Sequence, residues 1–139
     1  MLQALTLTIL AETFAIAKLD KGAPIPNWAS SNGWWSVTRT DDELSVVCPE
    51  PQVPTDVISN RGWKCLKVAG PLDFALTGVL ASLLKPLADA RISVFSVSTF
   101  DTDYLLVKTE SLAATAKILS LAGHQVLGLN QEQQRDGGA

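Results

Sequence analysis

The pattern that decides the fold lies in residues 63–129, which read WKCLKVAG (63–70), PLDFALTGVLASLLKPLADA (71–90), RISVFSVSTF (91–100), DTDYLLVKTE (101–110) and SLAATAKILSLAGHQVLGL (111–129). Alternating apolar side chains predict strands, and apolar side chains three and four residues apart predict helices. The order strand, helix, strand, strand, helix, strand indicates an α+β fold of the ferredoxin-like βαββαβ class. In this class both helices cover one face of an antiparallel sheet.

Capping residues set the expected limits of the two helices. Asp73 stands where the first helix needs an N-cap, and Ser111 stands at the start of the second. Gly123 fits the C-terminal end of the second helix. The predicted elements are a strand at 63–69, a helix with apolar residues from Leu76 to Leu87, strands at 92–98 and 104–108, a helix from 111, and a strand at 125–129.

Residues 1–62 are rich in strand signals but lack a helical pattern of the same quality. Leu5, Leu7 and Ile9 alternate with threonines, and residues 14–19 form a second extended candidate. Two further runs, at 34–39 and 43–48, predict a hairpin across a polar turn. We interpret residues 1–62 as a strand-rich, degenerate version of the same unit, and we expect the polar tail at 130–139 to be disordered.

Trp28, Trp34 and Trp35 gather in this first half. We expect them to pack in the core or at an interface, and an aromatic cage for a cation is the alternative.

Composition and charge exclude several classes of partner. Lys and Arg number 11 against 14 for Asp and Glu, with no basic run, so nucleic acid is not an expected partner. The apolar start of the chain lacks a basic segment, and Glu12 follows too early for a signal sequence or a membrane span. The isolated Cys48 and Cys65 fit a reducing compartment, with a disulfide as the less favoured reading. We therefore expect a cytoplasmic protein without a membrane partner.

Residues with catalytic chemistry are scarce. His124 is the only histidine and stands at a predicted junction of helix and strand, where a structural role is expected. With Cys48 and Cys65 it forms no recognisable zinc site, and no phosphate-binding glycine loop occurs. The sequence thus predicts no enzyme, no metal and no cofactor. A metal-dependent enzyme using Asp101 and Asp103 is the weakest alternative, because a hard cation prefers more oxygen ligands.

Two segments of the predicted fold end on adjacent strands and can meet. One is the start of the first helix, where backbone amides from about Leu72 to Phe74 can hold a carboxylate. The other follows the next strand, where Phe100 supplies an apolar wall. Either Asp73 of the first segment or Asp103 of the second can accept an ammonium. Together they predict a binding site for a small zwitterion.

These same segments resemble the ACT domain family. The resemblance rests on GPLDF (70–74), TG (77–78) and STFDTDY (98–104), followed by LLV (105–107). More narrowly, the chain is similar to the ACT domains of small bacterial proteins, aspartokinase regulatory regions and eukaryotic arginine sensors. The resemblance implies an ACT domain over residues 63–129 that binds an amino acid between paired units. It implies that Gly70, Asp73, Thr77, Thr99, Phe100 and Asp103 line the ligand. With their neighbours Pro71, Leu72, Phe74 and Ser98, these are the predicted ligand-binding residues.

The sequence leaves two functions open. The first is an amino-acid-binding regulatory sensor without catalytic activity, whose ligand is a small amino acid or a related metabolite. The alternative is a structural dimerisation or protein-docking module with a vestigial pocket. Both readings predict a homodimer, and a partner enzyme or regulator receives the output.

Overall fold

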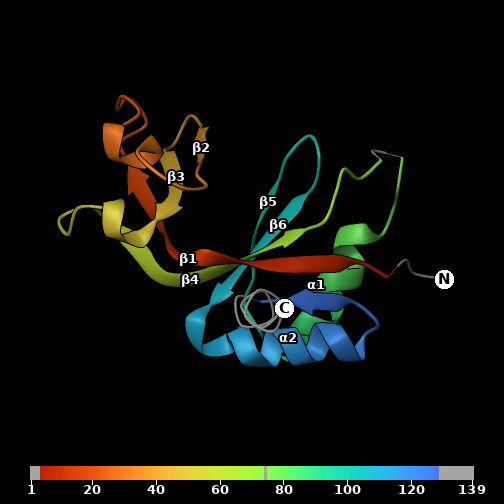
Figure 1. Ribbon diagram of the computed structural model, residues 1–139. Coiled ribbons are helices and arrows are strands. Elements are labelled where there is room, and N and C mark those ends of the chain that lie inside the picture. Colours follow the sequence, from red (N-terminus) through yellow and green to blue (C-terminus); the bar gives the residue numbers. More distant parts are fainter. Residues whose placement is uncertain (1–3, 74, 129–139) are drawn as a thin grey trace, which may run out of the picture. The chain divides into compact units, whose positions relative to one another are not determined.

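The computed structural model describes residues 4–73 and 75–128 (Figure 1). It contains both strands and helices, which places the chain in the α+β class. The elements are β1 (Thr6–Leu19), β2 (Ser36–Arg39), β3 (Leu44–Pro49), β4 (Ser59–Val68), α1 (Val79–Asp89), β5 (Phe95–Ser98), β6 (Asp103–Lys108), α2 (Leu112–Leu121) and β7 (Gln125–Leu127), with short 3-10 turns at Asn27–Ser30, Glu50–Gln52 and Thr109–Ser111.

The chain divides into two compact units. Unit 1 comprises Met1–Ala11 and Lys64–Ala139, and unit 2 comprises Glu12–Trp63. Strands β1 and β4 each run through both units, with one part of the strand in unit 1 and the other part in unit 2. The first half of β1 belongs to unit 1, whereas the predicted division kept all of residues 1–62 together. That half pairs with β7, which lies near the other end of the sequence.

Unit 1 is built on a sheet in the order β7, β1, β4, β6, β5. β1 runs parallel to β7, with Thr6 opposite Gln125, whereas β5 and β6 run antiparallel, with Ser98 opposite Asp103. The Ala69 amide donates to the Thr6 carbonyl at 2.7 Å, and at the other end of the same two strands the Lys18 amide donates to the Ile58 carbonyl at 2.9 Å. β1 and β4 are therefore antiparallel.

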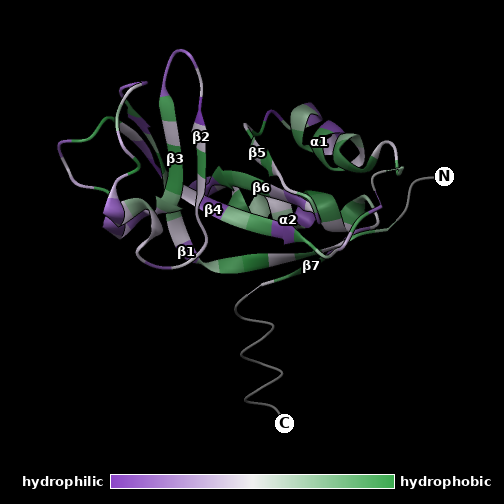
Figure 2. Ribbon diagram, turned by 90° about the horizontal axis from the view of Figure 1, so that it is seen from above, coloured by the Kyte–Doolittle hydropathy of each residue, from purple (hydrophilic) through white to green (hydrophobic). Residues whose placement is uncertain are grey.

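The core of unit 1 joins the two helices to one face of this sheet. Alternate residues of β1, β4 and β6 point to that face, because successive side chains of a strand point to opposite sides. Figure 2 shows the hydrophobic stretches of β1, β6 and α2 that contribute to it. The buried cluster consists of Leu5, Leu7, Leu66, Val68, Leu83, Leu87, Leu105, Val107 and Leu119.

His124 has a structural role at the edge of this core. It follows Gly123, whose φ of 100° ends α2 as predicted. Its imidazole is 7% exposed, and its Nδ1 accepts a 3.1 Å hydrogen bond from the Leu5 amide. The Gln125 amide in turn donates to the Leu5 carbonyl at 2.8 Å, so both backbone groups of Leu5 are paired. His124 therefore fixes the start of β1 beside β7.

Unit 2 contains the predicted hairpin. β2 and β3 pair antiparallel, with Val37 opposite Val46, and the Thr40 hydroxyl accepts hydrogen bonds from the amides of Asp42 and Glu43 at 3.1 Å. β1 pairs with the other edge of β3. The small core of this unit consists of Ala15, Ala17, Ala29, Leu44, Val46, Cys48 and Val53.

Two of the three clustered tryptophans pack as expected. Trp28 packs against the core of unit 2, and the Trp34 ring meets Phe14 edge to face at 5.6 Å. Trp35 is 44% exposed. The alternative prediction was an aromatic cage for a cation. The edge-to-face contact with Phe14 instead gives the Trp34 ring a packing role.

The start of the first helix was predicted incorrectly. α1 begins at Val79, after Gly78 in the left-handed conformation with a φ of 77°. Asp73 is therefore no N-cap of this helix. Its carboxylate instead accepts a 2.9 Å hydrogen bond from the Ala75 amide, which closes a turn well before the helix.

Smaller corrections concern the remaining elements. The two extended candidates in the first twenty residues join into the single strand β1, and β5 begins at Phe95 instead of residue 92. Ser111 does stand at the N-cap of α2, although its side chain makes no capping hydrogen bond. Leu129 and the tail at 130–139 lie outside the described residues.

Cys48 and Cys65 form no disulfide, and both are buried. Burial raises the pKa of the Cys48 thiol from 9.0 to about 11, and the positive charge of Arg61 opposes part of that rise. In the described part of the chain, no helix is long and apolar enough to cross a membrane.

Candidate functional site

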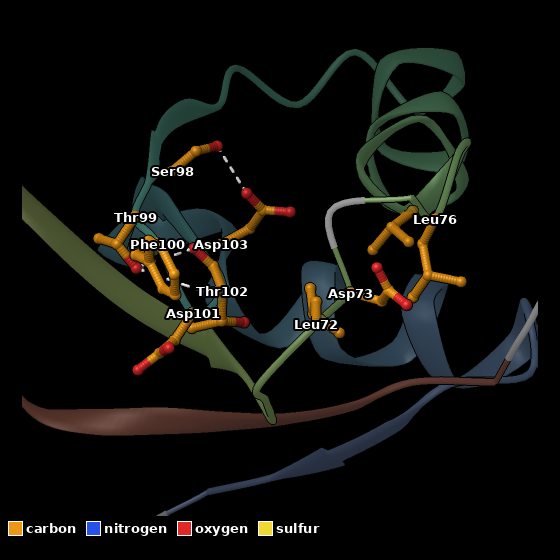
Figure 3. A pocket seen from close by; sticks show the side chains of 10 residues that line it. Leu72, Asp73, Leu76, Ser98, Thr99, Phe100, Asp101, Thr102 and Asp103 are labelled. Carbon is orange, nitrogen blue, oxygen red and sulfur yellow. Dashed lines mark hydrogen bonds between the residues drawn. The ribbon is translucent and has the colours of Figure 1, made fainter.

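A cavity of about 220 Å³ in unit 1 brings together the two segments that the sequence singled out (Figure 3). One wall is the segment before and at the start of α1, and the other is the turn between β5 and β6. The lining residues are Leu72, Asp73, Leu76, Val79, Ser98, Thr99, Phe100, Asp101, Thr102 and Asp103.

Backbone contacts hold these two walls together. The Leu72 amide donates a 2.7 Å hydrogen bond to the Asp101 carbonyl. Gly70 permits this approach, because an added Cβ would lie 2.9 Å from the Asp101 carbonyl oxygen and 3.1 Å from Thr102 Cβ. The peptide bond between Gly70 and Pro71 is cis. The buried Thr102 hydroxyl adds a 2.6 Å hydrogen bond to the Val68 carbonyl at the end of β4.

The β5–β6 turn is ordered by its own short side chains. The Thr99 hydroxyl donates to the Thr102 carbonyl at 3.1 Å, and the Thr99 amide donates to the same oxygen at 2.8 Å. The Ser98 hydroxyl donates to an Asp103 carboxylate oxygen at 2.5 Å. Figure 3 shows the Asp103 carboxylate turned toward the space beside the 72–76 segment and that of Asp101 turned away from it. Ser98 thus holds the Asp103 carboxylate in one orientation.

The cavity carries negative charge and an exposed apolar rim. Three aspartates line it, and none of its described lining residues is basic. Phe100 is 79% exposed and Leu76 is 43% exposed, and both line this cavity. This arrangement favours a ligand with an ammonium group and an apolar portion.

One of the backbone amides predicted to hold a ligand carboxylate already has an acceptor within the protein. The Leu72 amide is already bonded to Asp101, so it is not free for a ligand. The first hydrogen bond of α1 runs from the Ser82 amide to the Gly78 carbonyl at 2.9 Å, and no side chain caps this end. The amides at the start of α1 therefore lack helical acceptors, and Val79 brings this end to the cavity.

The structure gathers most of the predicted residues. Gly70, Pro71 and Thr77 do not line the cavity, and Phe74 lies outside the described residues. Sequence reasoning left out Leu76 and Val79 because their spacing matched the core face of a helix, and it treated Asp101 and Thr102 as turn residues. The predicted residues that line it are Leu72, Asp73, Ser98, Thr99, Phe100 and Asp103. Their binding role stays a prediction.

Comparison with known proteins identifies a known domain in the second part of the chain. The family model for the ACT domain matches residues 58–120, which include one wall of the cavity and the whole β5–β6 turn. A second model, for an N-terminal domain, matches residues 12–56. Residues 58–120 are therefore an ACT domain.

Similar proteins include a bacterial protein of known structure and a eukaryotic sensor. A protein from Agobacterium tumefaciens of known crystal structure is 44% identical, with 91% of this chain and 95% of that chain covered and a TM-score of 0.87. The human cytosolic arginine sensor for mTORC1 subunit 1 is 31% identical over 98 residues, covering 65% of this chain and 30% of the sensor. This ACT protein thus spans about 30% of the length of that sensor.

A more distant structure shares the fold of this ACT protein. It is the regulatory subunit of aspartate kinase from Thermus flavus, which has a TM-score of 0.60 at 10% identity, with 86% of this chain and 99% of that chain covered.

Proposed function

We propose that this ACT protein is a regulatory sensor that binds a small amino acid, or a related zwitterionic metabolite, in the cavity between residues 72–79 and 98–103. The observation that carries the proposal is the single cavity lined by the segment before α1 and by the acidic β5–β6 turn. The similarity to an arginine sensor and the shared fold with an aspartate kinase regulatory subunit support the same role. The protein acts by binding and carries out no catalysis.

The side chains suggest how such a ligand lies. Its α-ammonium bonds to the Asp103 carboxylate, which Ser98 holds in place, or to Asp73 on the opposite wall. Its α-carboxylate lies at the uncapped start of α1, where the helix dipole favours negative charge. The ligand side chain packs on Phe100 and Leu76. A second cationic group would find the other aspartate available.

The exposed rim suggests that a second copy completes the site. Phe100 is 79% exposed at the mouth of the cavity, and burying it removes apolar surface from water. In a homodimer, ligand binding shifts the equilibrium between two arrangements only by its difference in affinity for them. A partner enzyme or regulator then reads the arrangement.

The proposal includes the following organisation. Residues 63–129 form a ferredoxin-like ACT unit, and residues 1–62 contribute a degenerate, strand-rich half. The protein works in the cytoplasm, without nucleic acid or membrane as partner. Its net charge of −3 and the absence of a basic run fit this placement.

A structural docking module with a vestigial pocket is the second candidate. The exposed Phe100 and Leu76 favour it, because an apolar rim also suits a protein partner. In this reading the rim binds protein in the absence of any small ligand.

Calorimetric titration with each of the twenty amino acids separates the two functions. We expect at least one amino acid to bind, and Asp103→Asn to weaken it about tenfold or more, since a charge-assisted hydrogen bond contributes roughly 1.5–3 kcal/mol. Asp42→Asn, in the turn of unit 2, is the matched control and leaves affinity unchanged. Silence across the panel with an intact dimer supports the docking module.

A further inference from the structure

Unit 1 contains another cavity, of about 450 Å³, between α1 and the residues that follow α2. The two helices are in contact with each other, and the cavity runs along α1 from its N-cap to its last residue. No described residue lines both this cavity and the one at the β5–β6 turn. Its volume falls within the roughly 300 to 1,000 Å³ typical of small-molecule sites.

Half of the residues that line this cavity have no polar atom in their side chains. They are Gly78, Ala81, Pro86 and Ala122. Three of them belong to α1 or its N-cap and the fourth follows α2, so apolar groups face the cavity from both helices. Their side chains are short and leave the space between the helices unfilled. A ligand that places apolar surface against them removes that surface from water, which favours binding.

His124 supplies a hydrogen-bond donor to this cavity. Its ring is 7% exposed, and its Nδ1 accepts the hydrogen bond from the Leu5 amide at 3.1 Å. A neutral imidazole that accepts at Nδ1 carries its proton at Nε2. No hydrogen bond to Nε2 is present in the part of the chain that the structure describes, and this atom is not among the fully buried polar atoms without a partner there. The Nε2–H group is therefore open to the cavity that the ring lines.

The other polar side chains of the lining are already bonded within the protein. The Ser82 hydroxyl donates to the Val79 carbonyl at 2.7 Å, so its proton is not available to a ligand. Lys85 Nζ donates to the two Asp89 carboxylate oxygens at 2.9 and 3.0 Å. These two opposite charges lie together, so an ion of either sign would be attracted by one and repelled by the other. The lining therefore favours an uncharged ligand with one hydrogen-bond acceptor.

We propose that the cavity between α1 and the end of α2 binds a small, uncharged and largely apolar molecule that carries a carbonyl oxygen, such as a ketone, an ester or a lactone. Its apolar part packs against Ala81, Pro86 and Ala122, and its carbonyl oxygen accepts from His124 Nε2. A hydrocarbon of the same shape leaves this N–H group without an acceptor, which is unfavourable for a buried donor. The site shares no lining residue with the cavity proposed for an amino acid, so neither proposal depends on the other.

Titration of the ¹⁵N-labelled full chain with acetophenone tests this site by NMR. We expect saturable shifts of the backbone amides of Ala81 and Ala122 and of the ring nitrogen Nε2 of His124. In α-methylstyrene a CH₂ group replaces the carbonyl oxygen, and this probe should bind about three- to tenfold more weakly, the usual effect of losing one hydrogen bond. Shifts that do not saturate, or equal affinity for the two probes, overturn the proposal. Shifts of the same amides caused by protein concentration alone assign the cavity to a second copy of the chain and also overturn it.

Two variants assign the contacts. His124→Asn keeps an acceptor for the Leu5 amide but lacks Nε2–H, so it should bind acetophenone and α-methylstyrene equally. Ala81→Leu places a larger side chain in the cavity from an exposed position on α1, and should weaken both probes about tenfold whatever the state of His124. Ala114→Leu, at an exposed position of α2 outside the cavity, is the matched control and leaves both affinities unchanged.

Each variant has a result that contradicts the proposal. A preference for acetophenone that persists in His124→Asn overturns the hydrogen bond, and full affinity in Ala81→Leu overturns the location. Calorimetric titration of the same samples with amino acids reports separately on the cavity at the β5–β6 turn.

Discussion

The Leu72 amide and the Asp101 carbonyl are joined by a 2.7 Å hydrogen bond between two segments about thirty residues apart in sequence. This bond connects the wall before α1 to the β5–β6 turn, and both segments line the same cavity. It also uses an amide that otherwise would be free for a ligand. The backbone thus sets the width of the cavity, and the side chains of Asp73 and Asp103 set its charge.

Gly70→Ala should widen or distort this cavity. The new Cβ would meet the Asp101 carbonyl oxygen at 2.9 Å, so the two walls must separate and the Leu72 bond weakens. We expect a loss of about 1–3 kcal/mol in the free energy of unfolding, measured by urea denaturation. Gly22→Ala is the matched control, since its Cβ meets nothing within 4 Å. Equal stabilities of the two variants would show that the contact is unimportant.

Two buried threonines should respond in opposite directions to replacement by valine. Thr115 is fully buried in α2 and its hydroxyl has no hydrogen-bond partner, so Thr115→Val should stabilise the protein by about 1 kcal/mol. Thr102 is 4% exposed and donates to the Val68 carbonyl, so Thr102→Val should destabilise it by about 1–3 kcal/mol. Urea denaturation of both variants checks the signs. A loss of stability in Thr115→Val would contradict the account of that hydroxyl.

His124→Phe should loosen the start of β1. The phenyl ring fills similar space but leaves the Leu5 amide buried without its acceptor, which costs about 1–3 kcal/mol. Hydrogen exchange at the Leu5 amide should become faster in the variant. Gln125→Ala, at an exposed neighbour, should change stability by less than about 0.5 kcal/mol. Unchanged exchange at Leu5 would show that the imidazole does not hold the strand.

The free energy of unfolding at alkaline pH should depend on the ionisation of the buried Cys48 thiol. Its pKa rises from 9.0 to about 11 in the folded protein, so above pH 9 the unfolded chain releases this proton first. The contribution of the thiol to stability is complete below pH 9 and is lost as the pH rises toward 11. The difference in unfolding free energy between wild type and Cys48→Ala should shrink over that range by on the order of 2 kcal/mol. A constant difference would contradict the raised pKa.

The sequence predicted the hairpins, the two helices and the turn at 98–103 because local patterns determine them. Thr99 and Thr102 close that turn with their own hydrogen bonds, which makes it readable from its residues alone. The start of α1 could not be predicted from the pattern of apolar residues. Asp73 has the chemistry of an N-cap, yet it caps a separate turn and Gly78 sets the start of the helix.

Contacts between distant segments were the least predictable part of the site. The sequence placed Gly70 in the binding site. Gly70 does not line the cavity; its lack of a side chain leaves space for the Asp101 carbonyl. Leu76 and Val79 follow helical spacing, so the sequence assigned them to the core. Val79 does pack against the core and also lines the cavity, whereas Leu76 precedes α1, is 43% exposed and lines the cavity. The pairing of β1 with β7 likewise joins the two ends of the chain, and alternation within each strand does not indicate the partner.

The crystal structure of the protein soaked with the amino acid that binds in calorimetry tests the central claim most directly. The account predicts density in the unit 1 cavity, with the ligand ammonium within about 3 Å of the Asp103 carboxylate, a normal hydrogen-bond distance. Ligand density elsewhere on the molecule, with this cavity closed by its own side chains, would contradict it.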